Sequence, residues 1–293
     1  METDMKHMTR YLLAIALVAL PFHILLSQVK LPAPSPLQTL TQKVGYADLE
    51  LRYSRPLSRG REIFGNLVPY DVLWRMGANQ CTTISLSQNA VIGGKKIEAG
   101  KYSLLGIPGE KEWTIILNSK TEKFWPPSGY EPELNIHEFK VKPTETKQLY
   151  SELAYQFVDI DFEKAVLRLN WEHTQVEFEL RFDTDAKASK LIAEALKSPE
   201  NLKRGDYNNI ATYYALSGKN LDQALEMYDQ FIAKSKRPPY WVMFHKAELL
   251  ARMDRKAEAI SLAEEVIEIS KQDKVWGPKY ADWSAKLIKR LKK

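Results

Sequence analysis

VEFELRF, residues 176–182, alternates an apolar residue with a charged one over seven positions. Successive side chains of a β-strand point to opposite faces, so this pattern predicts a strand with one face in a core and the other in water. Two stretches upstream alternate in the same way, KAVLRLNW at 164–171 and LELRY at 49–53. Strands of this kind therefore decide the fold of the segment before residue 183.

Turn signals divide residues 40–182 into about ten short strands. Among these signals are Gly93-Gly94, Glu98-Ala-Gly-Lys101 and Pro108-Gly109. No helical crossover of useful length lies between the strands, which predicts an antiparallel β-sandwich or barrel. Gly93-Gly94-Lys95 lacks the helix N-terminus of a phosphate-binding loop and predicts a hairpin.

The hydrophobic period becomes helical after Asp183, with Thr184 and Asp185 as candidate helix caps. Two stretches then fit the tetratricopeptide pattern, and Ala224 and Ala259 are 35 residues apart, against a usual period of about 34. An ordinary helical bundle would show the same apolar stripe and is the alternative. The residues that fit are Tyr207, Ile210, Ala211, Tyr214, Gly218, Ala224, Tyr228 and Phe231 in the first copy, and Ala247, Leu250, Ala259, Ala263 and Val266 in the second.

The N-terminus has the pattern of a secretory signal. Lys6, His7 and Arg10 precede a mostly apolar stretch at 11–26, which is shorter than the roughly 20 residues that span a bilayer. We expect removal of residues 1–27, a periplasmic or secreted protein, and no stable membrane insertion afterwards; an uncleaved anchor is the alternative. Residues 28–38, with three prolines, predict a linker to a β domain at 39–183, and a helical domain occupies 184–293.

Composition indicates a globular protein, with 44% hydrophobic and 11% aromatic residues among 293. The excess of positive charge lies in the helical segment, but acidic residues are interspersed there, so we expect a solvated face and no nucleic-acid partner. The single cysteine, Cys81, excludes an internal disulfide and predicts a small buried side chain, not a nucleophile. The histidines stand far apart, and phosphate-binding or dinucleotide motifs are lacking, so neither a metal nor a cofactor is expected.

One set of residues between 55 and 79 could form a binding site. Arginine forks bind carboxylates, sulfates or phosphates in a bidentate manner, and aromatic faces suit sugar rings, so the set predicts a site for an anionic or carbohydrate ligand. The alternative is that the arginines brace loop carbonyls in a segment rich in glycine and proline. The candidate residues are Arg55, Arg61, Tyr70, Trp74, Arg75 and Asn79.

The same region carries a string of motifs: YSRP at 53–56, GREIFG at 60–65, LVPY at 67–70, WRMGAN at 74–79, GGK at 93–95, AGKYS at 99–103 and IPG at 107–109. In these motifs, residues from about 31 to 182 resemble the exported bacterial proteins grouped as domain of unknown function 2911. The resemblance implies an exported, β-rich domain, attached in some members to helical repeats. It implies no activity.

Two functions remain open. In the first, a non-catalytic binding or scaffolding protein docks a protein partner on its helical repeats and binds a small ligand on the β domain. In the second, a hydrolase acts on cell-envelope glycans through a carboxylate pair, with Glu50, Glu110 or Asp159 as candidates. The acidic pair Asp159 and Asp161 fits a solvated turn better than acid–base chemistry. The lack of a recognisable catalytic motif favours the binding protein.

Overall fold

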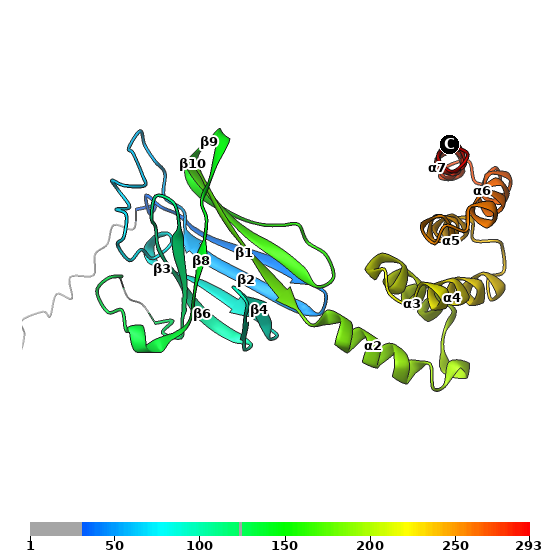
Figure 1. Ribbon diagram of the computed structural model, residues 1–293, viewed down its shortest axis with the longest axis horizontal. Coiled ribbons are helices and arrows are strands. Elements are labelled where there is room, and N and C mark those ends of the chain that lie inside the picture. The colour runs from blue at the N-terminus through cyan, green and yellow to red at the C-terminus, as the bar shows by residue number, and fades with distance from the viewer. Residues whose placement is uncertain (1–30, 123–124) are drawn as a thin grey trace, which may run out of the picture.

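The computed structural model describes residues 31–122 and 125–293, arranged as Figure 1 shows. The predicted signal peptide, residues 1–27, and the first residues of the predicted linker lie outside the described part of the chain. The described residues form two antiparallel β-sheets followed by six α-helices. Neither sheet closes on itself, so the barrel alternative is wrong for these residues.

The larger sheet has six strands in the order β1-β2-β3-β6-β7-β8. Leu49, Leu51 and Tyr53 are buried while Arg52 between them is exposed, as the alternation predicts. Leu37, the first residue of β1, already pairs with the last residue of β2. The strands are β1 (Leu37–Val44), β2 (Ala47–Ser54), β3 (Ala78–Leu86), β6 (Gly100–Ile107), β7 (Trp113–Asn118) and β8 (Asn135–Val141).

The smaller sheet has four strands in the order β5-β4-β10-β9. Gly93 and Gly94 join β4 to β5 with φ angles of 54° and 79°, so the predicted hairpin is present and its turn needs two residues that tolerate positive φ. β9 and β10 form a long hairpin of 15 and 19 residues, longer than the short strands expected, and its register shifts near Glu172. The strands are β4 (Ala90–Ile92), β5 (Lys95–Ile97), β9 (Thr144–Val158) and β10 (Lys164–Phe182).

Both sheets contribute side chains to one hydrophobic core. The irregular segment between β2 and β3 contributes to it as well, because Ile63, Phe64, Trp74 and Met76 are all buried. Trp74 lies stacked against Trp171 of β10, with ring centroids 6.1 Å apart. The glycine- and proline-rich turns of this segment therefore place aromatic side chains in the core.

The helical region begins directly after β10. Asp183 is the residue that caps its first helix, because its carboxylate accepts a hydrogen bond from the amide of Ala186 at 3.3 Å. Thr184 and Asp185, the predicted caps, lie inside the helix, so that prediction is wrong by one residue. The helices are α2 (Thr184–Ala195), α3 (Arg204–Ser217), α4 (Leu221–Ala233), α5 (Tyr240–Arg252), α6 (Lys256–Ser270) and α7 (Gly277–Leu291).

Consecutive helices pack as neighbours, α3 with α4, α5 with α6 and α6 with α7. In Figure 1, α3 and α5 lie on one side of this array and α4 and α6 on the other. Small residues fill the closest approaches, since Ala211, Ala224, Ala247 and Ala259 are completely buried. The predicted helical region is confirmed, and its assignment to tetratricopeptide repeats stays a prediction. No helix in the described ranges has both the length and the apolar character needed to cross a bilayer.

Candidate functional site

Two of the predicted arginines brace the segment that follows β2. The Arg55 guanidinium donates to Glu152 Oε1 at 2.8 Å and to Gln38 Oε1 at 3.3 Å. Arg61 donates from Nε to the carbonyl of Ser58 at 2.9 Å and from Nη2 to that of Leu57 at 2.8 Å. These bonds satisfy carbonyls and a carboxylate that strand pairing leaves free, as the loop-bracing alternative proposed.

The other polar and aromatic candidates also make internal contacts. Trp74 is 9% exposed and its indole N–H donates to the carbonyl of Gly77 at 3.1 Å. Tyr70 packs on the core, and Asn79 donates to the carbonyl of Ser35 at 3.0 Å. Because Trp74 lies in the core, its ring faces are not open to a sugar.

Arg75 differs from the other two arginines. It is half-buried, its Nε is fully buried without a hydrogen-bond partner, and within the described ranges its guanidinium makes no hydrogen bond or ion pair. Its positive charge acts on Cys81. Burial raises the pKa of the Cys81 thiol to about 12, although the hydrogen bond with Ser103 and the charge of Arg75 both lower it. A thiol of that pKa is protonated at neutral pH, which agrees with the buried, non-nucleophilic role predicted for Cys81.

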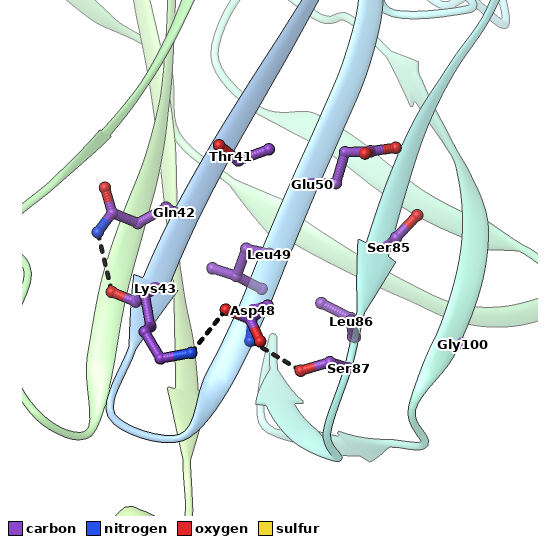
Figure 2. Close-up of a pocket in the computed structure, with 10 residues that line it drawn as sticks. All are labelled: Thr41, Gln42, Lys43, Asp48, Leu49, Glu50, Ser85, Leu86, Ser87 and Gly100. Atoms are coloured by element: carbon purple, nitrogen blue, oxygen red, sulfur yellow. Dashed lines mark hydrogen bonds and ion pairs between the residues drawn. The ribbon is translucent and has the colours of Figure 1, made fainter.

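A hollow with polar side chains along its lining lies on the larger sheet, on the face turned away from the core. It has a volume of about 560 Å³, and Figure 2 shows its lining. Thr41, Glu50 and Ser85 stand in register on β1, β2 and β3, so their side chains share one face. At one end Lys43 pairs with Asp48 at 2.8 Å. We call this hollow the sheet trough.

The helical region carries a larger concavity between α3, α5 and α7. One hollow of about 590 Å³ is continuous in its lining with a second of about 490 Å³, since both include His245, Glu248 and Arg290. We call the two together the helical groove. Its apolar walls include Leu216 and Trp241, which are 64% and 43% exposed. Asn208, Arg252, Trp283 and Lys286 also line the groove.

The charges of the helical groove are mostly positive. Arg252 donates to the carbonyl of Ala215 at 2.6 Å, a contact that leaves its charge uncompensated. The Arg290 guanidinium makes no ion pair or hydrogen bond to any described residue. Lys286 pairs with Asp282 at 2.7 Å, and Glu248 lies 3.7 Å from His245. The sequence reasoning missed these residues because each also fits an ordinary solvated helix face.

The carboxylates considered for hydrolysis belong to separate parts of the β region. Glu50 lines the sheet trough, Glu110 is exposed in the turn before β7, and Asp159 is exposed after β9. Asp161 accepts the amides of Glu163 and Lys164 at 2.7 and 2.9 Å, a turn role as expected. No cluster of potential metal ligands occurs in the described part of the chain.

The resolved shifts in carboxyl pKa are all downward. Lys219 lowers the pKa of Asp185, Arg255 that of Glu258 and Tyr240 that of Asp273, in each case through a side-chain hydrogen bond. The pKa of Glu179 is also lowered, because hydrogen bonds from Lys164 and Arg181 outweigh desolvation. A general acid in glycoside hydrolysis needs the opposite shift, so none of these four groups is suited to that role.

Residues 35–180 match the family described as Protein of unknown function (DUF2911). The match supports membership of the β region in that family, as its motifs indicated, and it ends before the helices. Comparison of the chain with curated proteins and with solved structures gives no significant match.

Proposed function

We propose that this protein is a non-catalytic binding protein that docks a segment of a partner protein in the helical groove. The observation that carries the proposal is the groove itself, a continuous concavity with exposed apolar walls and uncompensated cations. Exposed Leu216 and Trp241 offer apolar surface to a docking side chain. An occupant that covers them gains the free energy of apolar burial.

The charges select the chemistry of the partner. Arg252, Lys286 and Arg290 line the groove against a single acid, Glu248. An acidic peptide segment with an apolar or aromatic anchor residue complements both features. Arginine also suits carboxylates geometrically, because its fork can form two parallel hydrogen bonds.

We infer that α3–α4 and α5–α6 are two tetratricopeptide repeats capped by α7; the 35-residue spacing of the fully buried Ala224 and Ala259 supports this. We infer that the two sheets form a β-sandwich, in line with their shared core. We also propose export to the periplasm, which mass spectrometry tests by finding a new N-terminus between residues 27 and 33.

A defined peptide pair tests the groove. The full chain is titrated with a labelled acidic peptide that carries one tryptophan, and with the same peptide in which lysines replace the acids. We expect the acidic peptide to bind, and Arg290→Glu to weaken its binding about tenfold or more, the equivalent of 1.4 kcal/mol. Lys289→Glu, a neighbouring charge reversal outside the groove lining, serves as the control.

A second comparison isolates the apolar anchor. Trp241→Ala should weaken binding of the acidic peptide. Trp276→Ala should not, because Trp276 is 56% exposed but does not line the groove. Binding of both peptides with equal affinity, or loss of binding in both tryptophan variants alike, would contradict the proposal. Release of reducing ends from envelope glycans, abolished by Glu50→Gln, would favour the hydrolase alternative instead.

A further inference from the structure

Strand register brings two cations to the outer face of the larger sheet, on either side of β3. Arg52 of β2 pairs with Thr83 of β3, and Lys101 of β6 pairs with Ser85 of β3. Directly paired residues share a face, and so do residues two apart on one strand. Arg52, Thr83, Ser85 and Lys101 therefore project from the same face, with the two cations on strands about 10 Å apart.

Both cations are free of internal partners. Neither the Arg52 side chain nor that of Lys101 makes a hydrogen bond, ion pair or cation–π contact with any residue that the structure describes. Elsewhere on the β region, Arg55, Arg168 and Arg181 all pair with glutamates. The two groups are therefore available to an anion from outside the chain.

A small hollow lies between them. Its volume is about 60 Å³, and Arg52, Thr83 and Lys101 all line it. A water molecule occupies about 30 Å³ in the liquid, so the hollow has room for one small oxyanion group. Thr83, which is only 8% exposed, contributes its side chain to the lining.

The neighbouring carboxylates restrict the charge of the ligand. Glu122 lines the small hollow, and Glu50 lies beside it in the sheet trough. Two cations and two acids leave no net charge for a polyanion, but the fork of Arg52 still suits one carboxylate. Multiply charged phosphates would be repelled by the acids at short range.

The sheet trough lies farther along the same face, because Glu50 and Ser85 are two residues from Arg52 and Thr83 on β2 and β3, and it offers a different chemistry. Ser85 lies between Glu50 and Lys101 in one cross-strand row, and both Ser85 and Glu50 line the trough together with Thr41. The hydroxyls donate and accept hydrogen bonds, and the Glu50 carboxylate accepts them. This combination suits a ligand rich in hydroxyl groups.

We propose that the outer face of the larger sheet binds an acidic saccharide. One sugar carboxylate lies between Arg52 and Lys101 over Thr83, and the following sugar hydroxyls lie in the sheet trough against Thr41, Glu50 and Ser85. The site is distinct from the predicted site around Arg55 and from the helical groove, so it does not depend on the proposed docking function.

Calorimetric titration of the full chain tests the proposal with three probes: a trisaccharide that carries a single glucuronic acid residue, neutral maltotriose and inorganic phosphate. We expect the acidic trisaccharide to bind at least about tenfold more tightly than either of the others. Arg52→Gln and Lys101→Gln should each lower the affinity for the acidic trisaccharide by about tenfold. Arg237→Gln removes an exposed arginine whose side chain is likewise without a partner in the described residues, and it should leave the affinity for the trisaccharide unchanged.

A further variant separates the trough from the charges. Ser85→Leu fills part of the trough while Arg52 and Lys101 remain. It should therefore lower the affinity for the trisaccharide and leave the melting temperature close to that of the unsubstituted protein. Equal binding of maltotriose, binding of phosphate as tight as that of the trisaccharide, or an unchanged affinity in Arg52→Gln would each overturn the proposal. Absence of binding by all three probes would overturn it as well.

Discussion

Three arginines that look equivalent in the sequence have three different roles in the structure. Arg61 satisfies two nearby carbonyls, Arg55 pairs with Glu152, and Arg75 has no described partner. Glu152 lies 97 residues beyond Arg55, so local composition could not identify it as the partner. The sequence correctly indicated loop bracing as an alternative, but only the fold decides which arginine braces and which is free.

Substitutions at Arg55 and Arg75 should therefore have opposite consequences. Arg55→Ala removes a part-buried ion pair and leaves Glu152 unpaired, and we expect it to lower the free energy of unfolding by about 1 kcal/mol. The Nε of both arginines is buried and unsatisfied, but the Arg75 guanidinium, unlike that of Arg55, has no other partner among the described residues, so the stability of Arg75→Ala should stay the same or rise. Urea unfolding of both variants checks this; a larger loss for Arg75→Ala would show that Arg75 braces the loop after all.

Another unsatisfied polar side chain belongs to a buried asparagine on β10. Asn170 is completely buried, and neither its amide nitrogen nor its oxygen has a hydrogen-bond partner. A buried unsatisfied polar group costs about 1–3 kcal/mol, so Asn170→Leu, similar in volume, should raise the free energy of unfolding by about 1 kcal/mol or more.

Asn118 is the matched control for this experiment. It is equally buried, but its amide donates to the Glu131 carbonyl at 2.9 Å and to Asn135 Oδ1 at 2.7 Å, and its oxygen accepts the Lys120 amide. Asn118→Leu should therefore lower the unfolding free energy by about 2 kcal/mol in the same thermal or urea assay. A loss of stability in Asn170→Leu comparable to that of the control would contradict the argument.

At the scale of single elements, periodicity was the reliable guide. The alternation of apolar and charged residues predicted β2 and β10. The paired glycines at 93 and 94 predicted the hairpin between β4 and β5. The segment between β2 and β3 has no such period, so its contribution to the core could not be predicted in this way. Ile63 and Phe64 are buried because both sheets converge on them, and that is a tertiary fact with no local pattern.

The turn between α6 and α7 depends on one carboxylate. Asp273 accepts hydrogen bonds from the amides of Val275 and Trp276 at 2.8 and 3.0 Å, and from the hydroxyl of Tyr240 at 2.6 Å, which ties the turn to the start of α5. The Tyr240 bond and then the amides hold the pKa of Asp273 below its usual range. Burial, followed by the Asp273 bond, raises the pKa of Tyr240 to about 12.

These shifts set the pH range over which the tie stabilises the helical region. Because the pKa of Asp273 is lowered by folding, its contribution to the free energy of unfolding is present above about pH 4 and is lost as the pH falls further. Because the pKa of Tyr240 is raised by folding, its contribution is present below about pH 10 and is lost toward higher pH. Asp273→Ala should therefore lower the melting temperature between about pH 5 and 9. The deficit should shrink at either extreme, and Asp282→Ala, at an exposed ion pair, should show neither effect.

At the scale of the whole molecule, the two regions have separate cores. One cluster contains the side chains of both sheets and the segment between β2 and β3, whereas two others lie entirely within residues 192–291. The side-chain contacts that cross the junction include one ion pair and two aromatic contacts: Lys219 pairs with Glu163 at 3.3 Å, Lys187 lies 4.7 Å from the centroid of the Tyr46 ring, and Phe162 packs against Tyr213 with ring centroids 5.5 Å apart. The change of period after Asp183 marked this boundary in the sequence, because each period belongs to its own core.

Separate cores predict independent folding of the two regions. A fragment of residues 31–183 should unfold cooperatively with a strand-dominated circular dichroism spectrum, since it retains every side chain of the β-region core. A fragment of residues 184–293 should be helical, with its own melting transition. The Lys219–Glu163 ion pair across the junction is partly exposed and contributes little, so each fragment should melt within a few degrees of the matching transition in the full chain. If the β fragment is unfolded on its own, α2 and the turn bearing Lys219 belong to its folding unit, and the boundary at residue 183 is wrong.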